Sequence, residues 1–342
     1  MVNEVILDNL ERKKKGVMRN RAPKTHIYLT GGLGNQLFQV AAAMTRDASL
    51  IGIESILGSP RTNQMGLPDV YDFEFPTKLV LQQSSSSSSF VFFVKKVTGY
   101  VLRTGLNPQG IEKTAAHKNL VRFTSSVILS LYFRHPIRVI QATDNGFCVL
   151  PESKGQEILI GYFQSYKWAD YSDVQEVLKS IELKNPSDML LNFLRHSEGK
   201  KSLMVHVRLG DYKSENGFGI PEKKYIEDSL KAQFSYMNYD QIALFSNEPT
   251  EAIEYIPVEY RSKTMVVSEF DGRAAETLEA MRHMHGYVIA NSSLSWWGAF
   301  LCKHKNPFVI APRPWFKGNP EPTDIIPPNW QRIYAWSNFR NT

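Results

Sequence analysis

The sequence predicts an α/β protein built from doubly wound parallel sheets. In the second half of the chain, short apolar runs alternate with segments of helical periodicity, which is the pattern of repeated βαβ units. Polar motifs follow several of these runs, at the edge where parallel sheets bind ligands. The predicted strands lie at 202–207, 241–246, 264–268, 286–290 and 307–311, and the predicted helices at 222–235, 273–284 and 294–304.

The first half begins with a similar strand, turn and helix. Residues 26–30 form the predicted strand, Gly31–Gln36 a glycine-rich turn, and the helix that follows has an apolar face. That face carries Leu37, Ala41, Met44, Ala48 and Ile51. Residues 157–163 predict another strand. Between them, residues 59–90 are predicted to be irregular, with the serine run Ser84–Ser89 as a flexible loop, and residues 91–145 mix helical and strand patterns.

We expect two domains, at 25–197 and 198–335, after a disordered basic tail at 1–24. The boundary is placed near Lys184–Lys201, where Lys, Asn, Pro, Ser and Gly accumulate. A chain of 342 residues is long enough for two full hydrophobic cores. Two such domains face to face would leave a cleft with one ligand on each side.

Composition and charge exclude several classes of protein. Hydrophobic residues make up 42% and charged residues 22%, as in an ordinary soluble enzyme. The net charge is +6, but the basic run Arg12–Lys15 has no interleaved aromatic residues, so we expect no nucleic-acid partner. No apolar stretch approaches the roughly 20 residues that span a bilayer. Cys148 and Cys302 support neither a disulfide scaffold nor a cysteine-based zinc site, and two buried thiols are expected.

Polar motifs end three of the predicted strands. The carboxyl ends of parallel strands share one edge of the sheet, so the Arg, Ser, Asn and Asp side chains are expected to converge on one site. The arginine and the paired serines suggest that the ligand carries phosphate. The motifs are His206–Asp211 (HVRLGD), Phe245–Glu248 (FSNE) and Asn291–Gly298 (NSSLSWWG).

The first motif contains the candidates for catalysis. Arg208 leaves the end of its strand, and a guanidinium can grip a diphosphate through two parallel hydrogen bonds. Asp211 could orient Arg208 through a salt bridge, cap the following turn, or act as a base. His206 lies within the strand alternation, so it is either a candidate base or a hydrogen-bonded core residue.

The third motif precedes a helix. Asn291, Ser292 and Ser293 offer polar side chains beside free backbone N–H groups, which attract anions, although helix capping alone would also explain them. Trp297 either anchors the core or forms a wall of the cleft. The Asn-Ser-Ser triplet also matches a glycosylation sequon, but a buried strand end is a poor acceptor.

Two other segments supply further candidates. Ser246 ends its strand and is expected to bond the ribose or base of a nucleotide, while Asn247 and Glu248 either join it or cap the next helix. Gln164 follows the strand at 157–163 in an aromatic segment, which suits either sugar binding or core packing.

The turn Gly31–Gln36 partly matches the dinucleotide fingerprint G-x-G-x-x-G, but Leu37 occupies the third glycine position. Three interpretations are open. The turn is a nicotinamide site with Glu54 as the ribose-binding acid, a tight turn without function, or a loop that contacts a ligand in the cleft. In the third interpretation the ligand-contacting residues are Gly32, Gly34, Asn35 and Gln36.

No metal-binding motif is present, neither H-E-x-x-H nor a carboxylate pair of the Asp-x-Asp kind. We therefore expect no metal and no cofactor. Arg208 and the helix start at Ser292 could stabilise a departing diphosphate without a metal ion.

Four segments together resemble the α-1,2-fucosyltransferases of glycosyltransferase family 11. They occur in the family's order and span residues 26–312. The first and last are long and specific to the family. The segments are Gly31–Gln39 (GGLGNQLFQ), Gly161–Ser165 (GYFQS), His206–Tyr212 (HVRLGDY) and Ala290–Ala299 (ANSSLSWWGA).

The resemblance implies a GT-B arrangement, two Rossmann-like domains with a donor/acceptor cleft between them. It implies metal-independent, inverting transfer of L-fucose from GDP-β-L-fucose to the 2-hydroxyl of a terminal galactose on a glycan. By position, Arg208 would hold the diphosphate, Asn291–Ser293 would line the nucleotide pocket, and Asn35 would approach the donor from the opposite domain. Eukaryotic members work in the Golgi behind a membrane anchor, so a Golgi location is expected by analogy, with this chain either truncated or a soluble member.

The sequence departs from the family pattern in three places. Phe245–Glu248 stands where the family usually has Phe-Ser-Asp-Asp, residues 273–285 keep few of the family's usual residues, and residues 55–155 are unfamiliar. Two alternative functions therefore stay open, a protein O-fucosyltransferase-like enzyme and an inactive glycan-binding relic. A nicotinamide oxidoreductase is the alternative from another class.

Overall fold

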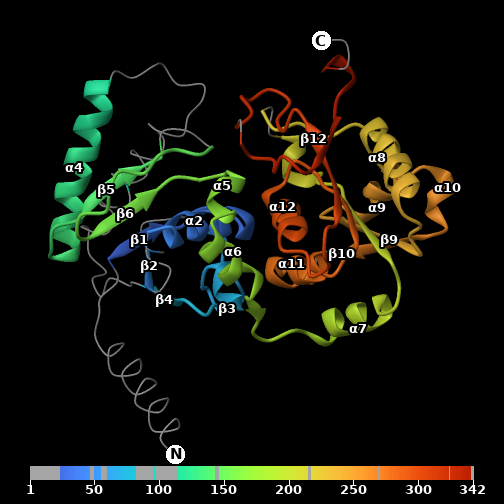
Figure 1. Ribbon diagram of the computed structural model, residues 1–342, viewed down its shortest axis with the longest axis horizontal. Helices are drawn as coiled ribbons and strands as arrows, with labels where there is room; N and C mark the ends of the chain where they lie inside the picture. The colour runs from blue at the N-terminus through green and yellow to red at the C-terminus, as the bar shows by residue number, and fades with distance from the viewer. Residues whose placement is uncertain are drawn as a thin grey trace, which may run out of the picture.

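The computed structural model describes residues 24–46, 50–54, 60–81, 96, 115–142, 146–214, 217–268, 270–322 and 324–339. The basic tail before Lys24 and the serine run Ser84–Ser89 lie outside these residues. The chain forms two parts side by side, one from its N-terminal half and one from its C-terminal half (Figure 1). We call them the first and the second domain.

The first domain is built on a parallel sheet. Within the described residues it has five strands in the order β4-β2-β1-β6-β5. The order reverses between β1 and β6, so the loops that follow these two strands meet at the switch point of the sheet. The strands are β1 (Thr25–Tyr28), β2 (Leu50–Glu54), β4 (Lys78–Leu81), β5 (Arg138–Gln141) and β6 (Glu157–Ile160).

The second domain has a parallel sheet of six strands in its described residues, in the order β10-β9-β8-β11-β12-β13. Numbered within the domain, this is the 3-2-1-4-5-6 order of the Rossmann fold, with its switch point between β8 and β11. The strands are β8 (Ser202–His206), β9 (Gln241–Ser246), β10 (Thr264–Ser268), β11 (Gly286–Val288), β12 (Phe308–Arg313) and β13 (Gln331–Tyr334).

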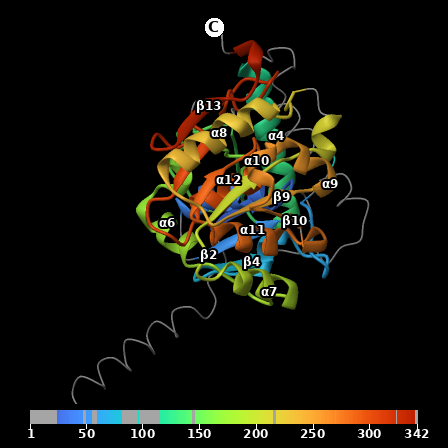
Figure 2. The ribbon, with the colours of Figure 1, turned by 90° about the vertical axis from the view of Figure 1, so that its right-hand side faces the viewer.

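Helices connect the strands and cover the sheets (Figure 2). A two-residue antiparallel pair, β3 (Phe73–Glu74) with β7 (Glu182–Leu183), lies outside both sheets. The helices are α2 (Leu33–Met44), α4 (Ala115–Phe133), α5 (Tyr166–Ala169), α6 (Ser172–Lys179), α7 (Asp188–Ser197), α8 (Lys223–Tyr236), α9 (Pro249–Ala252), α10 (Val258–Arg261), α11 (Ala274–Arg282) and α12 (Ser293–Phe300), with 3-10 turns η1 (Asp69–Asp72), η2 (Gly210–Lys213), η3 (Ile253–Tyr255), η4 (Phe270–Gly272) and η5 (Ser337–Phe339).

Alternate residues of β8 pack on opposite faces of the second sheet, as strand geometry requires. Leu203 and Val205 join a core with Leu230 of α8. Met204 faces the other way, into a core that also contains residues of α11, α12 and the first domain. The apolar interior is therefore continuous from one domain to the other.

Aromatic side chains form the centre of the contact between the domains. Phe38 of α2 lies with its ring centroid 4.6 Å from that of Trp296 and 4.9 Å from that of Trp297, both on α12. All three side chains are fully buried. Burying rings of this size contributes strongly to an interface, so α2 and α12 hold the domains in one relative position.

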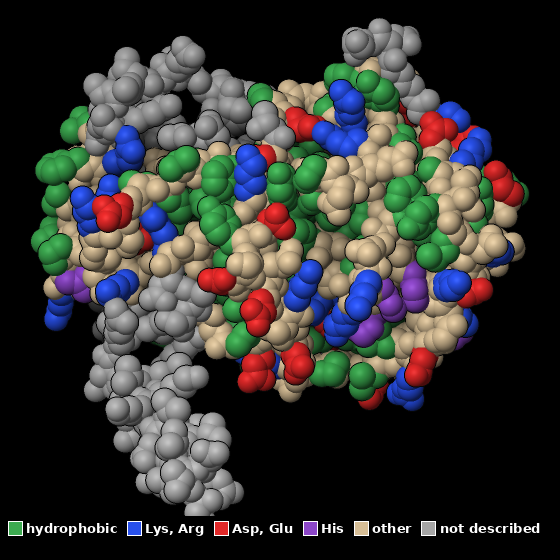
Figure 3. Space-filling view, in the orientation of Figure 1, with side chains coloured by type: hydrophobic (Ala, Val, Ile, Leu, Met, Phe, Trp, Pro, Cys, Tyr) green, Lys and Arg blue, Asp and Glu red, His purple; other side chains and the backbone are tan. Residues whose placement is uncertain are grey.

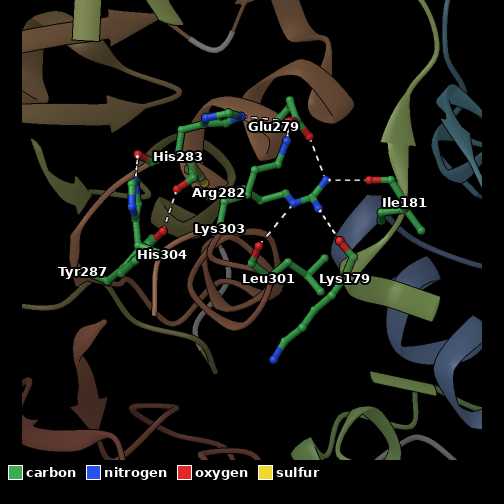
Figure 4. A network of polar contacts seen from close by, with 10 residues as sticks. Lys179, Ile181, Glu279, Arg282, His283, Tyr287, Leu301, Lys303 and His304 are labelled. Carbon is green, nitrogen blue, oxygen red and sulfur yellow. Dashed lines mark hydrogen bonds and ion pairs between the residues drawn. The ribbon is translucent and has the colours of Figure 1, made fainter. Parts of the chain in front are cut away.

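A buried arginine adds polar contacts across the same boundary (Figure 4). Arg282 of α11 is 1% exposed and donates to the carbonyl oxygens of Ile181 (3.1 Å), Lys179 (3.2 Å) and Leu301 (3.3 Å). Its guanidinium also pairs with Glu279 at 2.8 Å. A charge this deeply buried is tolerated because the carbonyl oxygens and the Glu279 carboxylate accept hydrogen bonds from the N–H groups of the guanidinium.

The α/β fold class is confirmed, and the five strands and three helices predicted in the second half all form. One prediction was wrong in detail. The region 59–90 is not irregular throughout, because β4 pairs along the edge of the first sheet. The segment 184–201, near which the domain boundary is expected, contains α7, which is capped where Ser187 Oγ accepts the Leu190 N–H at 3.2 Å. The boundary and the domain limits stay predictions.

Two expectations from composition can be compared with the structure. Cys148 and Cys302 form no disulfide. Among the helices that the structure describes, none combines the length and apolar character needed to cross a membrane.

Candidate active site

A cavity of about 750 Å³ lies where the switch points of the two sheets face each other. This volume is in the range of small-molecule binding sites. Both domains contribute to its wall. The lining includes Gly32, Leu33, Gly34, Asn35, Pro60, Arg61, Thr62, Asp69, Tyr162 and Gln164 from the first domain, and Arg208, Asp211, Tyr212, Phe218, Gly272, Ala274, Thr277, Asn291, Ser292, Ser293, Leu294, Trp315, Phe316 and Asn319 from the second.

Arg208 lies at this cavity in a fixed orientation. Its Nε donates to Asp211 Oδ1 at 2.9 Å and its Nη2 to Asp211 Oδ2 at 3.1 Å, so the two side chains form a bidentate pair. Arg61 approaches the same carboxylate, with Nη2 3.6 Å from Asp211 Oδ2. Of the three roles considered for Asp211, the geometry supports orientation of Arg208.

The loop that carries Arg208 is held from two sides. Asn247 Oδ1 accepts the N–H of Leu209 at 3.0 Å, and Tyr212 donates its hydroxyl to the carbonyl of Asn291 at 3.0 Å. Gly210 has φ +21°, and a Cβ there would overlap the Asn247 side chain. Burial raises the pKa of Tyr212 to about 12, so its hydroxyl remains a donor at neutral pH.

Ser246 does not line the cavity. Its side chain is fully buried, and its Oγ accepts the N–H of Glu248 at 3.0 Å. The segment Phe245–Glu248 therefore supports the Arg208 loop from behind, which corrects the predicted contact of Ser246 with a nucleotide. The physical reason is that Ser246 is the last residue of β9, buried within the sheet, and the Asn247 that follows it bonds the Arg208 loop instead of lining the cavity.

Asn291, Ser292 and Ser293 line the cavity at the start of α12, as predicted. Helix capping does not explain them, because the N-cap residue Ser292 makes no side-chain capping bond. Asn291 Nδ2 donates to the carbonyls of Phe218 and Gly219, each at 3.0 Å. Its Oδ1 is buried and has no partner among the described residues. The start of α12 can therefore offer hydroxyl groups and backbone N–H groups to an anion in the cavity.

The glycine-rich turn faces the same cavity from the first domain. Gly31 has φ +73°, which favours glycine, and Gly32 and Gly34 line the cavity with Asn35. Gln164 Nε2 donates to Asn35 Oδ1 at 2.9 Å, which orients the asparagine. The turn therefore lines the cavity, which the interpretation as a ligand-contacting loop requires, and that contact itself stays a prediction.

Gln36 and Trp297 lie in the interior. Gln36 was predicted to contact the ligand, and of the two roles left open for Trp297, core anchor and cleft wall, the structure shows the first. Gln36 is fully buried, with Nε2 3.0 Å from the carbonyls of Gly31 and Arg61 and Oε1 3.0 Å from the N–H of Val70. Trp297 is also fully buried, and its Nε1 donates to the carbonyl of Gly34 at 2.9 Å. Both side chains face away from the cavity because they fasten the glycine-rich turn.

His206 is also separated from the cavity. It lies within β8 and is 1% exposed, and neither ring nitrogen has a partner among the described residues. Burial, with a further contribution from the Arg208 charge, lowers the pKa of His206 to about 3. The ring is therefore neutral at physiological pH. A base that must touch a substrate hydroxyl needs access that His206 lacks.

Several lining residues were missed by the sequence interpretation. Arg61 and Asp69 come from the region predicted to be irregular, and they reach the cavity because Pro60 bridges to Gly31. The ring of Phe218 lies 5.1 Å from that of Tyr212 and 5.4 Å from that of Phe316, counted between centroids. No motif marks these positions. For Arg61 and Asp69, the one signal in the sequence was that each is a charged residue directly after a proline.

In the described part of the lining, the electrostatics of the site combine two cations with two carboxylates. These are Arg61 and Arg208 with Asp69 and Asp211, and no other Asp, Glu, Lys, Arg or His is among the described lining residues. Burial and the neighbouring Asp72 raise the pKa of Asp69 to about 6, against the opposing charge of Arg61. In the described part of the chain, no cluster of three or more His, Cys, Asp or Glu side chains is placed to hold a metal ion.

The outer surface is mixed in charge. On the face drawn in Figure 3, lysine and arginine side chains are interspersed with aspartate and glutamate rather than gathered in one continuous patch. The expectation of no nucleic-acid partner stays a prediction.

Two Rossmann-like domains that face each other across a polar cavity form the GT-B architecture, and an arginine at the switch point suits a glycosyltransferase that uses a nucleotide-activated sugar. The family model described as glycosyl transferase family 11 matches residues 24–334. The chain therefore belongs to glycosyltransferase family 11.

Two relatives from Escherichia coli are similar to the chain. One is an alpha-1,2-colitosyltransferase, 28% identical over 188 residues, which are 53% of this chain and 63% of the relative. The match therefore spans less than two thirds of that enzyme. The other is the O-antigen biosynthesis glycosyltransferase WbnK, 23% identical over 313 residues, which cover 85% of this chain and 94% of the relative.

Solved structures with a similar backbone fold include two fucosyltransferases. The NodZ alpha-1,6-fucosyltransferase soaked with GDP-fucose matches with a TM-score of 0.46 and 11% identity, over 87% of this chain and 100% of NodZ. POFUT1 in complex with GDP matches with a TM-score of 0.42 and 11% identity, over 85% of this chain and 98% of POFUT1. At these scores, the fold assignment rests on the strand order of this chain itself.

Proposed function

We propose that the protein transfers L-fucose from GDP-β-L-fucose to the 2-hydroxyl of a terminal galactose on a glycan, with inversion and without a metal ion. Membership of family 11 supports glycosyl transfer. The relative named as an alpha-1,2-colitosyltransferase carries the same linkage in its name, which supports transfer to a 2-hydroxyl. Donor and acceptor identities rest on the family resemblance of the motifs.

The observation that carries the proposal is the paired placement of Arg208 and Asn35. Arg208, oriented by Asp211, presents a permanent cation at the switch point of the second domain. Asn35, oriented by Gln164, faces the same cavity from the first domain. A nucleotide bound at Ser292 and Ser293 would therefore place its diphosphate near Arg208 and its sugar toward Asn35.

The chemistry that this arrangement supports is an in-line displacement. The acceptor oxygen bonds to the anomeric carbon while the bond from that carbon to the diphosphate oxygen breaks, and GDP leaves with the electron pair. Arg208 and the first amides of α12 would stabilise the negative charge that develops on GDP. Losing one preorganised donor of this kind typically raises the barrier by about 2.7–4 kcal/mol.

The altered segment Phe245–Glu248 does not by itself favour an inactive relic. Asn247 supplies the oxygen that accepts the Leu209 N–H, and an aspartate at this position would supply the same acceptor. The support behind Arg208 is therefore intact. The relic and the protein O-fucosyltransferase-like alternative become outcomes of the assay described next.

The test is transfer of labelled fucose from GDP-fucose to a panel of β-galactosides, with and without EDTA. We expect an EDTA-resistant product that an α-1,2-specific fucosidase cleaves. A product formed only on a folded epidermal-growth-factor-like domain would favour the O-fucosyltransferase-like alternative. GDP-fucose binding without any transfer would favour the relic. The Golgi location implied by the resemblance is tested separately, by fluorescence microscopy of the tagged protein.

Arg208→Ala tests the diphosphate clamp directly. We expect kcat to fall about 10²–10³-fold while the protein stays folded. The matched control is Arg261→Ala, which removes a surface arginine paired with Glu254 at 3.1 Å and outside the cavity lining. Turnover of Arg208→Ala at the level of Arg261→Ala would contradict the clamp.

A further inference from the structure

We propose that Asp69 is the general base of the reaction, and that the segment 60–72 is the wall of the cavity on which the acceptor hydroxyl lies. This assignment rests on the proposed function. The segment belongs to the part of the chain that matches none of the four family motifs, so its role follows from the structure alone.

Among the described residues, Asp69 is the carboxylate of the cavity that has no partner. The described part of the cavity lining contains two acidic residues, Asp69 and Asp211. Asp211 is bound by Arg208 and approached by Arg61, so its oxygens are engaged. The Asp69 carboxylate forms no hydrogen bond and no ion pair in the described part of the chain, although the residue is only 6% exposed and lines the cavity.

The position of Asp69 is fixed by its backbone. Its N–H donates to the carbonyl of Arg61 at 3.2 Å, and the N–H of the next residue, Val70, donates to Gln36 Oε1 at 3.0 Å. The same Gln36 side chain donates to the carbonyl of Arg61 at 3.0 Å. A catalytic group must be held within a fraction of an ångström to be effective. These hydrogen bonds among the backbone of Asp69 and Val70, the Gln36 side chain and the Arg61 carbonyl provide that restraint.

Asp69 shares the cavity with the phosphate clamp, since both Asp69 and the Arg208–Asp211 pair line it. Arg61 links the two electrostatically, because its guanidinium approaches Asp211 and its charge acts on Asp69. An in-line displacement needs the attacking hydroxyl on the side of the anomeric carbon opposite the leaving group. The proposal therefore assigns the acceptor hydroxyl to Asp69 and the departing GDP to Arg208.

The charges around Asp69 suit a base that works near neutral pH. Burial, and to a smaller extent Asp72 on the same turn, raise its pKa to about 6 against the opposing charge of Arg61 from the preceding loop. Asp211, the other acidic residue of the described lining, is approached by the same Arg61. A carboxylate with such a pKa is ionised at pH 7 and still basic enough to share a proton in the transition state.

The step balances as follows. The ionised Asp69 carboxylate takes the proton of the acceptor hydroxyl as the oxygen bonds to the anomeric carbon. The bond from that carbon to the diphosphate oxygen breaks, and GDP departs with the electron pair beside Arg208. Asp69 is left protonated and releases its proton to solvent before the next turnover.

The test compares Asp69→Asn with the wild-type enzyme in the fucose-transfer assay across pH. We expect kcat to fall about 10²–10⁴-fold in Asp69→Asn, while its affinity for GDP, measured by calorimetry, stays within about twofold. The wild-type profile of kcat/KM should fall below about pH 6, and this acid limb should be absent from the residual activity of the variant. Asp69→Glu should recover part of the lost rate because it restores a carboxylate.

Asp72→Asn is the matched control. It keeps an acceptor for Asn63 Nδ2, which bonds Asp72 Oδ1 at 2.7 Å, and it lies outside the cavity lining. Because Asp72 raises the pKa of Asp69, the variant should keep its plateau rate and move the acid limb to lower pH.

The outcomes separate the two proposals. If the wild-type protein transfers no fucose, the proposed function fails and the assignment of Asp69 fails with it. If the wild-type protein transfers fucose and Asp69→Asn does so at the same rate, or keeps the acid limb, only the assignment of the base is overturned. Loss of GDP binding in Asp69→Asn would show a structural role and would also overturn it.

Discussion

Gly34 and Ser293 bring the two domains into direct contact at the nucleotide site. A Cβ at Gly34 would lie 2.5 Å from both the carbonyl carbon and the Oγ of Ser293, so only glycine fits. The two residues start α2 and α12, the helices whose aromatic side chains join the domain cores. The first turn of each helix therefore meets the other at the edge of the cavity.

Gly34→Ala should destabilise the protein by about 1–3 kcal/mol, the usual cost of overpacking, although alanine favours a helix by up to about 1 kcal/mol. The atoms in the way are largely backbone, which cannot rotate aside. Urea unfolding and GDP titration check the change. Gly32→Ser is the control, because its Cβ would meet only the Arg61 side chain among the described residues, at ordinary distances of 3.6 Å from Cδ and 4.0 Å from Nε. Equal unfolding free energies for the two variants would contradict the close contact.

We expect Asn247 to contribute to stability and turnover through its side-chain oxygen, whether the side chain that supplies this oxygen is neutral or charged. Asn247→Leu removes the acceptor of the Leu209 N–H and should cost about 1–3 kcal/mol of stability, with a loss of turnover because Arg208 loses its support. Asn247→Asp keeps the acceptor and should retain turnover. Denaturant unfolding and the transfer assay measure both. Similar turnover in Asn247→Leu and Asn247→Asp would contradict the role of Asn247 in supporting the Arg208 loop.

The second sheet and the strand-end site were predictable because they depend on local patterns. Apolar runs separated by helical periodicity predict βαβ units, and the polar residue that follows each run is placed by the sheet itself. Arg208, Asn291 and Asn35 were found in this way. The domain-level arrangement followed from the family resemblance, and the strand order of the structure now supports it.

The errors share a physical origin. Gln36, Ser246 and Trp297 have the residue types and positions of ligand-binding groups, but the distinction between facing the cavity and facing the interior depends on long-range packing. Arg61 and Asp69 reach the site through the bridge between Pro60 and Gly31, a contact with no local periodicity. Such residues can be identified only once the two sheets are placed together.

Gln36 should contribute to stability more than any surface glutamine. Gln36→Met leaves the buried N–H of Val70 without its acceptor, and an unsatisfied buried group of this kind costs about 1–3 kcal/mol. It also removes one of two hydrogen bonds from each of the carbonyls of Gly31 and Arg61, which keep the N–H groups of Arg61 and Asp69 as donors. We expect a lower unfolding midpoint and faster proteolysis of the segment 60–72. Gln175→Met, which removes only an exposed 3.3 Å bond to Asp170, is the control. A midpoint equal to that of the control would argue against this role.

Glu279 should make the contact between the domains sensitive to acid. Burial alone would raise its pKa, but a hydrogen bond from His283 (3.1 Å) and the charges of Arg282 and Lys303 outweigh burial and lower the pKa to about 2 (Figure 4). A carboxyl whose pKa is depressed on folding stabilises the protein above its unfolded pKa near 4.5, and this contribution is lost as the pH falls toward 2.

The expected contribution of Glu279 is about 3 kcal/mol at neutral pH, from roughly 1.4 kcal/mol per pKa unit. Glu279→Gln should therefore lower the unfolding free energy at pH 7 by at least this amount, because it also leaves the Arg282 charge uncompensated. The difference from wild type should shrink as the pH falls from 5 toward 2. Urea unfolding at several pH values measures it, with Glu254→Gln in the exposed pair with Arg261 as the control. A difference that stays constant across this range would show that Glu279 is not ionised in the folded protein.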